Sequence, residues 1–199
     1  MKRNLTLGIA LIVAIILTAS VSLAGESYSV DPAHSSIGFS VRHMGLSSVR
    51  GQFNDFSAEF NVEETDLAMS SIVFEIDASS IDTGEEGRDN HLRSDDFLDV
   101  ENHGQIVFKS KSIKKTGDSE YEAVGDLTMH GVTKEVTLEL EVGGPLADGR
   151  GNMRIGVEGE VTIDRQDFDV NFSRLMDNGG LVVGNEVKIS FAIEATRKT

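Results

Sequence analysis

Hydrophobic and polar residues alternate along most of the chain after residue 25. Alternation with a period of two is typical of β-strands that bury one face. In residues 34–43, for example, Ile37, Phe39 and Val41 share one face, while serine, glycine and arginine share the other. The pattern recurs in seven further runs, at residues 56–62, 71–78, 105–110, 121–129, 136–142, 153–163 and 183–195. About eight strands joined by polar or glycine-containing links predict an all-β protein, either an antiparallel sandwich or a barrel.

One connection between these runs has the features of a short helix. Thr83 and Glu86 form a Thr-x-x-Glu capping box, with acidic residues in the first turn. His91 and Asp95 lie four positions apart and would share one face of that helix. Residues 88–103 hold two histidines, five carboxylates and two arginines. They therefore raise the question of a metal or acid–base site.

Two other connections are marked by their residue types. His130 and Gly131 stand between two alternating runs. A two-residue type I′ turn needs positive φ at both central positions, which glycine adopts freely and histidine tolerates better than most residues. We therefore interpret His130 as a turn residue. Residues 164–180 form a longer irregular link between the last two strands.

The first residues have the organisation of a secretory signal peptide. Two basic residues precede an apolar stretch at residues 5–17, and small residues at Ser22 and Ala24 match a cleavage site. An uncleaved membrane anchor is the alternative, because the apolar stretch up to the cleavage site would just span a bilayer. We predict a signal peptide of residues 1–24 and a single domain of residues 25–199, which is large enough for a substantial core.

Charge and cysteine content narrow the classes of partner. The formal net charge is −15, and removal of the signal peptide takes away two positive charges and no negative ones, which leaves −17. Such a surface repels nucleic-acid phosphates and anionic lipid headgroups. We therefore expect no nucleic-acid partner and no stable membrane anchoring after cleavage. The chain has no cysteine, so neither disulfides nor thiolate chemistry is available.

Few residues combine into a recognisable catalytic or metal motif. There is no H-E-x-x-H helix, no G-x-S-x-G turn and no glycine-rich phosphate loop. The five histidines are scattered, at His34, His43, His91, His103 and His130. We therefore expect no catalytic residue, no metal and no cofactor. The alternative is a metal-dependent enzyme that uses His91 and Asp95, with His34 or His103 as further ligands.

The inward faces of the strands carry most of the large apolar side chains. They would form either a packed core or the wall of a cavity, because a barrel of about eight strands has room for side chains or for one small ligand. Several inward positions hold small residues that would leave space, namely Ala58, Ala78, Ala123, Gly125, Gly159 and Ala195. The residues predicted to contact a ligand are Phe39, Val41, Phe56, Phe60, Ile72, Phe74, Ile76, Phe108, Leu127, Met129, Leu138 and Phe191.

Several stretches together resemble the YceI family of lipid- or polyisoprenoid-binding domains. The matching runs are HSSIGFSVRHMG, GQFNDFSAEF, DNHLRSDDFLD, GDLTMHGVTKEVTLEL and VGNEVKISFAIEA, which cover most of residues 25–199 in order. The resemblance implies an extended, lipocalin-like antiparallel β-barrel with one helix in a connection. It also implies export to the bacterial periplasm and an apolar tunnel for an isoprenoid chain or similar amphiphile. Family members are often dimers, and no fixed catalytic set is implied.

The resemblance also bears on residues 88–103, which match the family's helix and the turn after it. Leu92 and Phe97 would then anchor this segment to the barrel. The charged residues around them would form ion pairs and helix caps, namely Arg88, Arg93, Asp95 and Asp96. Two departures affect local loop shape, because His103-Gly104 replaces an aromatic-proline pair and Asp169 replaces a glycine.

The function predicted from these observations is a periplasmic carrier that reversibly sequesters a long-chain isoprenoid or similar amphipathic lipid inside the barrel. We expect a neutral head such as a quinone or alcohol, because an acidic rim would repel pyrophosphate. Two alternatives stay open. One is the metal-dependent enzyme described above, and the other is a filled barrel with a stress-related structural role.

Overall fold

The computed structural model describes residues 25–177 and 179–198. This part of the chain forms strands β1 (Glu26–Val30), β2 (Ser36–His43), β3 (Ser47–Phe53), β4 (Phe56–Val62), β5 (Ser71–Asp77), β6 (Ile81–Asp82), β7 (Gln105–Lys115), β8 (Glu120–Met129), β9 (Val132–Ala147), β10 (Asn152–Asp164) and β11 (Val183–Lys198). Its one α-helix is α1 (Glu86–Arg93), and its short 3-10 turns are η1 (Pro32–His34), η2 (Leu67–Met69), η3 (Ala78–Ser80) and η4 (Arg165–Phe168).

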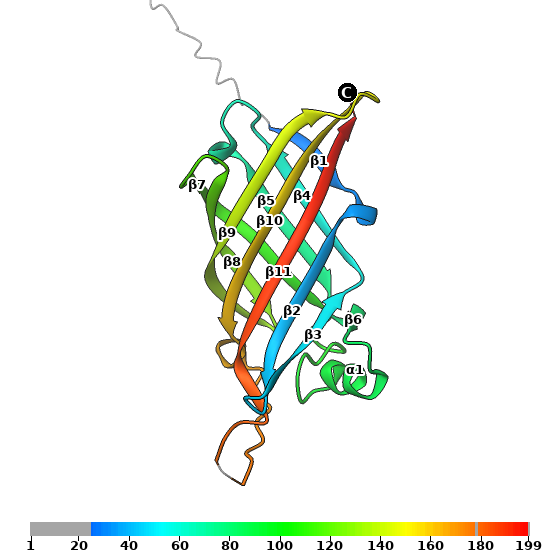
Figure 1. Cartoon of the computed structure of the whole chain (residues 1–199), viewed down its shortest axis with the longest axis vertical. Helices are drawn as coiled ribbons and strands as arrows, with labels where there is room; N and C mark the ends of the chain where they lie inside the picture. Colours follow the sequence, from blue (N-terminus) through cyan, green and yellow to red (C-terminus); the bar gives the residue numbers. More distant parts are fainter. Residues whose placement is uncertain (1–24, 178, 199) are drawn as a thin grey trace, which may run out of the picture.

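Eight of the strands close into an elongated antiparallel barrel (Figure 1). Their order around the barrel is β1-β4-β5-β7-β8-β9-β10-β11, and the pairing of β1 with β11 completes the ring. Helix α1 lies beside the lower end, where the β8–β9 turn and the link between β10 and β11 also lie. The predicted antiparallel barrel of about eight strands with one short helix is confirmed.

The last strand holds the closure together because it pairs along both of its edges. One edge of β11 pairs with β10 over its whole length. The other edge pairs first with β2 and then, after the interruption at η1, with β1. Strand β2 pairs with β3, and β3 pairs with the two-residue β6, so the sheet extends outside the ring beside the lower part of the barrel (Figure 1). Strand β11, near the end of the described chain, therefore pairs with β1 and β2, near its beginning.

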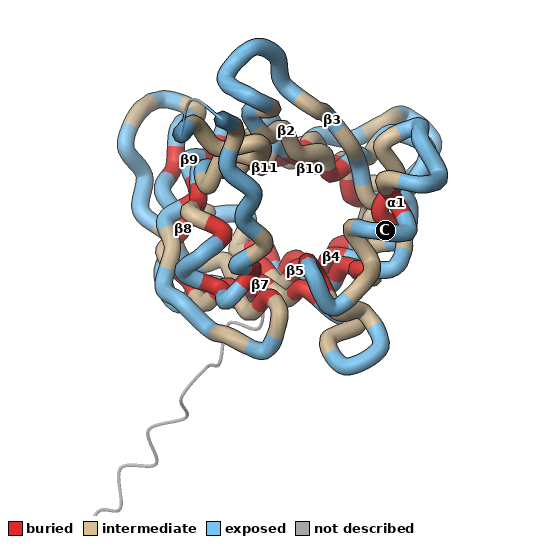
Figure 2. The backbone as a smooth tube through the Cα atoms, turned by 90° about the horizontal axis from the view of Figure 1, so that it is seen from below, coloured by how far each residue is buried: buried red, intermediate tan, exposed pale blue. Residues whose placement is uncertain are grey.

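The alternation predicted from the sequence places the apolar side chains on the inner wall. Viewed along the barrel, the buried positions lie around the inside of the backbone ring (Figure 2). Strand β8 shows the pattern clearly, because Tyr121, Ala123, Leu127 and Met129 are all buried while Glu122 between them is exposed. Burial of these faces is the main source of stability, at about 25 cal/mol for each Å² of apolar surface removed from water.

The predicted strand positions are correct, but three strands were missed. These are β1, β3 and β6. Strand β6 has only two residues, which is too short for any alternating pattern. Strand β1 buries one large residue, Tyr28, and β3 carries Gly51 in the middle of its run. The predicted strands at 105–110 and 136–142 also continue further than expected, to Lys115 and Ala147.

The start of the helix differs in detail from the predicted capping box. Glu85 is the N-cap, and its carboxylate accepts hydrogen bonds from the backbone N–H groups of Gly87 and Arg88. Thr83 instead donates its backbone N–H to the buried carboxylate of Asp89 at 2.9 Å. A carboxylate at the N-cap accepts hydrogen bonds from the free N–H groups of the first turn. Its negative charge also interacts favourably with the positive end of the helix dipole.

The expected turn at His130 is confirmed, with φ values of 51° at His130 and 75° at Gly131. Asp169, where the resemblance implies a glycine, also adopts a left-handed conformation, with φ of 57°. Aspartate tolerates this region better than most residues because its short polar side chain can hydrogen-bond locally. The departure from the family pattern therefore preserves the turn after η4.

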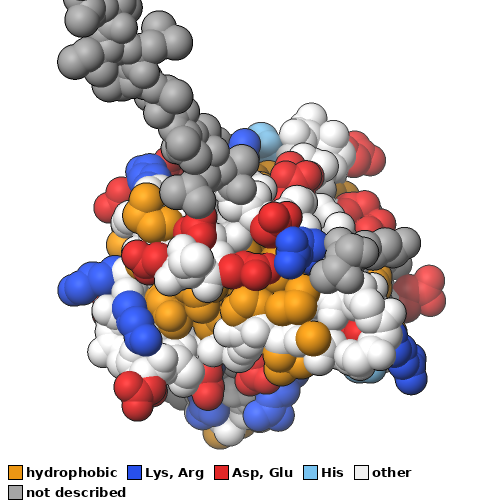
Figure 3. Space-filling view, turned by 90° about the horizontal axis from the view of Figure 1, so that it is seen from above, with side chains coloured by type: hydrophobic (Ala, Val, Ile, Leu, Met, Phe, Trp, Pro, Cys, Tyr) orange, Lys and Arg blue, Asp and Glu red, His pale blue; other side chains and the backbone are white. Residues whose placement is uncertain are grey.

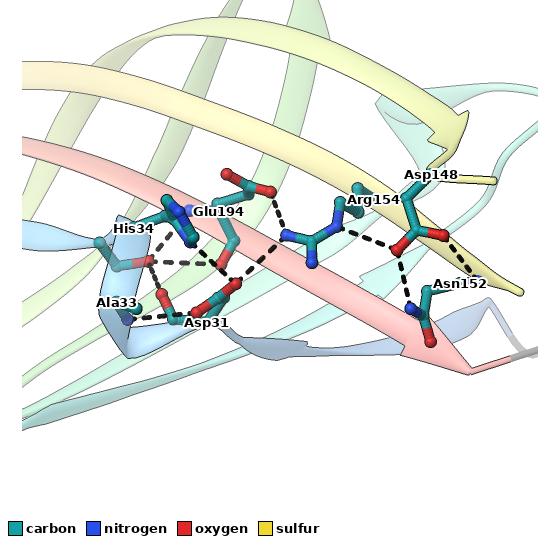
Figure 4. Close-up of polar contacts among 8 residues, drawn as sticks. Asp31, Ala33, His34, Asp148, Asn152, Arg154 and Glu194 are labelled. Carbon is teal, nitrogen blue, oxygen red and sulfur yellow. Dashed lines mark hydrogen bonds and ion pairs between the residues drawn. The ribbon is translucent and has the colours of Figure 1, made fainter. Parts of the chain in front are cut away.

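The pairing of β1 with β11 closes the ring of strands, and we call this closure the seam of the barrel. A network of charged side chains connects the chain segments at the seam near its upper end (Figure 4). Arg154 on β10 contacts Glu194 on β11 and lies 3.2 Å from Asp31, which follows β1. On its other side, Arg154 lies 3.3 Å from Asp148 in the β9–β10 turn. Hydrogen bonds from Asn152, from the backbone of residue 150 and from Arg154 hold the pKa of Asp148 well below its ordinary value. Asp148 is therefore charged in the folded protein even in moderately acidic solution.

This network predicts an acid-dependent loss of stability. Because the folded pKa of Asp148 is lower than its unfolded value near ~4, the ionised carboxylate stabilises the fold above that pH and loses this contribution as the pH falls through the folded pKa. Asp148→Ala is expected to unfold at a lower temperature than the wild type near pH ~7, and this difference should narrow steadily below pH ~4. Thermal unfolding followed by circular dichroism at several pH values measures both effects.

Asp118 supplies the matched control, because it is an exposed acid in the β7–β8 turn at the same end of the barrel. Asp118→Ala should unfold close to the wild-type temperature at each pH. A deficit of Asp148→Ala that stays equally large in strong acid would show that the charge of this carboxylate is not responsible.

The predicted signal peptide, residues 1–24, lies outside the described residues. Within residues 25–177 and 179–198, no helix has the length and apolar character needed to cross a bilayer.

Candidate ligand-binding interior

Three apolar voids follow one another along the inside of the described barrel. The lower void, about 110 Å³, lies where α1, η4 and the β8–β9 turn close the barrel, and side chains from β2, β5, β7, β8, β10 and β11 line it. The middle void, about 50 Å³, shares four lining residues with the lower one, namely Ile37, Ile76, Ile106 and Ile189. The upper void, about 30 Å³, shares no lining residue with the middle one.

Four phenylalanine rings separate the middle void from the upper one. The ring of Phe74 on β5 lies 5.1 Å from that of Phe191 on β11, measured between centroids, and these two strands are not neighbours in the barrel. Phe74 also contacts Phe60 at 5.9 Å and Phe108 at 6.3 Å. The apolar interior that the resemblance implies is therefore divided in this structure, because aromatic rings from different walls meet inside the barrel.

The two small inward glycines, Gly125 and Gly159, do not leave open space, because neighbouring rings occupy it. A Cβ atom added at Gly125 would lie 2.6 Å from the ring of Phe108, and one at Gly159 would lie 2.6 Å from the ring of Phe191. Both distances are shorter than any ordinary carbon–carbon contact. These glycines therefore provide the room in which the phenylalanine rings sit against the wall.

Eleven of the twelve residues predicted to contact a ligand line one of the three voids. The lower void is lined by Phe39, Val41, Ile76 and Met129; the middle void by Phe74, Ile76, Phe108, Leu127, Leu138 and Phe191; and the upper void by Phe60 and Ile72. Phe56 lines none of them and packs half-buried against the core. Contact of the eleven with a ligand stays a prediction.

The sequence and the fold of this chain both match those of known proteins. A family model for the YceI-like domain matches residues 28–195. The chain belongs to the YceI family. A UPF0312 protein of Vibrio parahaemolyticus is 37% identical over 173 residues, which cover 85% of this chain and 89% of that protein.

Two solved structures have the same fold as this YceI domain. BcnA of Burkholderia cenocepacia superposes with a TM-score of 0.73 at 26% sequence identity, over 83% of this chain and 98% of BcnA. A polyisoprenoid-binding domain from Saccharophagus degradans, implicated in plant cell wall breakdown, superposes with a TM-score of 0.64 at 18% identity, over 84% and 97% of the two chains. At this low identity the second likeness shows the fold alone.

Sequence reasoning missed much of the lower wall of the YceI barrel. Leu98 and Val170 line the lower void although they lie in irregular segments. Others were on predicted strands but were not selected, such as Ile106 and Ile189. Their alternating positions in the sequence could have identified the strand residues. No local sequence pattern identifies the loop residues, because their position beside the void depends on the three-dimensional path of the chain.

Arg165 in η4 is a charged residue of the lower wall that the sequence did not predict. Its side chain lines the lower void, and the residue is only 3% exposed. Its Nε donates to the carbonyl of Gly184 at 3.0 Å, one Nη contacts the carbonyl of Val170, and the other donates to Asn185 at 3.2 Å. Burial lowers the pKa of this guanidinium, because desolvation disfavours the charged form. The lower wall therefore contains a buried cation whose nitrogen atoms bond to oxygens of the chain, while the surface of the void itself is apolar.

The segment 88–103 encloses the lower end of the YceI barrel largely as predicted. Leu92 and Phe97 line the lower void and anchor this segment. The arginines bind backbone oxygens rather than the neighbouring acids: Arg88 donates to the carbonyl of Thr83, and Arg93 donates to those of Ser79 and Ile81. The expected arginine–carboxylate pairs are therefore replaced by hydrogen bonds that fix the chain before the helix.

The histidines of the proposed metal-dependent enzyme do not converge. His91 lies 2.8 Å from Asp96 rather than pairing with Asp95. His34 lies 3.0 Å from Asp31 in the seam network. The expected pair at positions four apart fails because α1 ends at Arg93, so Asp95 is no longer on the helix.

The upper end of the barrel combines apolar and acidic side chains. Viewed from above, apolar side chains gather in the middle of this end, with acidic side chains among them (Figure 3). The half-buried Leu67 and Val142 line the upper void. At the same end, Tyr28 donates a hydrogen bond of 2.6 Å to Glu64, and burial together with this bond raises the pKa of Tyr28 to about 12. Tyr28 therefore stays a neutral donor throughout the physiological range.

Proposed function

We propose that the barrel binds one long-chain amphipathic lipid of the isoprenoid type, with its chain along the barrel axis and its polar head near Arg165. The observation that carries this proposal is the series of apolar voids with a buried guanidinium at the lower end. The polyisoprenoid-binding domain of Saccharophagus degradans, which has the same fold, supports a ligand of this class.

The hydrophobic effect supplies enough free energy for such binding. Each buried CH₂ group contributes ~0.8 kcal/mol, so about ten of them give ~8 kcal/mol, which corresponds to micromolar affinity before entropic costs. The lower void has about 110 Å³, below the ~150 Å³ that holds a benzene molecule in an engineered cavity. Binding of a long chain therefore requires the aromatic cluster to move so that the voids join.

The guanidinium of Arg165 favours a head that carries an acceptor oxygen. A guanidinium has five N–H groups, and each of its two Nη atoms keeps a second N–H after the contacts to Val170 and Asn185. A quinone carbonyl or an alcohol oxygen would accept such a bond without bringing in a multiply charged group. The net charge of the protein disfavours a pyrophosphate head.

We further propose that the protein acts in the periplasm as a lipid carrier. Export by the signal peptide would bring the protein to the periplasm, where a carrier shields an apolar chain from water. We assign it binding rather than catalysis, because the voids are lined almost entirely by apolar side chains. Association into a homodimer, as in other family members, stays a prediction that size-exclusion chromatography with light scattering can test.

Mass spectrometry of the purified protein tests the proposal directly. Organic extraction of protein purified after export is expected to release an isoprenoid or similar amphiphile at close to one molecule per chain. Delipidated protein should then take up a prenyl alcohol or prenyl quinone on challenge. Absence of any lipid in the extract, together with no uptake on challenge, would contradict the proposal and favour the filled structural barrel.

A further inference from the structure

Three side chains with metal-binding groups meet below the lower void. Asp99, His103 and His130 each place one ligand atom within 4.8 Å of the other two, and all three residues are half-buried. Within residues 25–177 and 179–198, no other group of three or more histidines, cysteines or acids has this arrangement. Two imidazoles and one carboxylate form a donor set that first-row transition metals prefer.

The backbone holds these side chains together from two separate parts of the chain. Asp99 adopts a left-handed conformation, with φ of 45°, and its carbonyl accepts the backbone N–H of His103 at 2.8 Å. His130 is in the tight β8–β9 turn, and its ring meets that of His103 at 4.9 Å between centroids. Gly131 permits this approach, because a Cβ atom there would lie 2.7 Å from the ring of His103. Both connections are therefore shaped so that the two imidazoles meet.

The hydrogen bonds around Asp99 and His130 orient these side chains as metal ligands are usually oriented. Nδ1 of His130 lies 3.2 Å from the carbonyl oxygen of Phe168. Since a carbonyl can only accept, Nδ1 carries the hydrogen and Nε2 keeps a free lone pair. Both oxygens of Asp99 lie 3.0 Å from the side-chain amide of Asn102, which fixes the carboxylate. Metal-binding histidines and carboxylates are typically oriented by such outer hydrogen bonds.

One pair of these ligand atoms requires only a small movement to hold an ion. Nε2 of His103 lies 4.0 Å from Oδ2 of Asp99. Two ligands of a tetrahedral ion at ~2.1 Å are ~3.4 Å apart, so a shift of about half an ångström brings these atoms into place. Two nitrogen ligands favour zinc, cobalt, nickel or copper over calcium and magnesium, which prefer oxygen ligands.

We propose that Asp99, His103 and His130 bind one divalent first-row transition metal ion of the zinc type, with a coordination position left for water. The site would join the connection between α1 and β7 to the β8–β9 turn. Leu98 and Met129, the neighbours of Asp99 and His130 in the chain, both line the lower void. The ion would therefore fix two side chains in the wall of the ligand-binding interior.

Calorimetric titration of metal-free, untagged protein with zinc chloride tests the site. The wild type is expected to bind one ion per chain, and cobalt chloride should give the visible absorption of a site with nitrogen ligands. His103→Gln and Asp99→Asn each remove one ligand, and His130→Asn removes a third while tolerating the positive φ of the turn. Each of these variants should bind zinc at least about tenfold more weakly.

His91→Gln is the matched control, because His91 is also a histidine within hydrogen-bond distance of an aspartate, Asp96, but has no third ligand. Its zinc affinity should equal that of the wild type. Zinc should also raise the unfolding temperature of the wild type and of this control, but not that of His103→Gln. The proposal is overturned if the wild type shows no saturable zinc binding, or if His103→Gln and His130→Asn bind zinc as tightly as the wild type.

Discussion

Replacement of Phe74 by alanine is expected to destabilise the barrel and yet to increase its affinity for a long chain. Phe74 is 5% exposed and contacts three other rings, so its loss should lower the free energy of unfolding by about 3–5 kcal/mol. The same change removes the ring at the centre of the aromatic cluster and joins the middle void to the upper one. Burial of about two more CH₂ groups would then tighten binding of a long prenyl alcohol roughly tenfold.

Urea unfolding and ligand titration measure the two effects separately. A short prenyl alcohol whose chain would not extend beyond the lower void, which Phe74 does not line, should bind Phe74→Ala as it binds the wild type. Phe56→Ala is the control, because Phe56 is half-buried on a neighbouring strand and lines no void. It should lose less stability and bind both alcohols normally. A folded Phe74→Ala protein that binds the long alcohol no better than the wild type would show that the cluster does not limit chain length.

Replacement of Arg165 by leucine is the second change with a large expected effect. The carbonyls of Val170 and Gly184 would lose their donor inside the lower wall, which should lower the free energy of unfolding by about 3 kcal/mol. The wild type should bind a prenyl alcohol about tenfold more tightly than a hydrocarbon of the same chain length, because a hydrogen bond to a charged group is worth about 1.5–3 kcal/mol. Arg165→Leu should bind the two equally well.

Arg174→Leu provides the comparison, because Arg174 is exposed in the nearby link between β10 and β11. It should keep both the stability and the preference for the alcohol. Equal binding of alcohol and hydrocarbon by the wild type itself would place the polar head elsewhere, without contradicting an apolar chain in the barrel.

The sequence predicted the inner wall well because strand alternation is a local property. Phe39, Phe60 and Phe108 were assigned to the inside from their own neighbours in the chain, and each lines a void. What could not be predicted is which wall residues face one another. That Phe108 fills the space above Gly125 depends on the register between β7 and β8, which the alternating pattern does not contain.

The same reason explains why the histidine cluster was missed. His103 and His130 are far apart in the sequence, and each has a sufficient local interpretation, one as a loop residue and the other as a turn residue. Only the packing of the two connections brings their rings together. Arg165 was missed because an isolated arginine in an irregular segment is usually solvated, and its burial follows from the path of η4 beneath the barrel.

The position of β11 has a consequence for how the protein is made. This last strand is the shared partner of β10, β2 and β1, which lie on either side of it. A chain that has been synthesised only as far as β10 lacks this strand, so the hydrogen-bonding groups on the open sides of β10 and β2 have no partner until residues 183–198 are made. Synthesis of residues 183–198 therefore sets the moment at which the barrel can close, and the growing chain needs protection from aggregation until then.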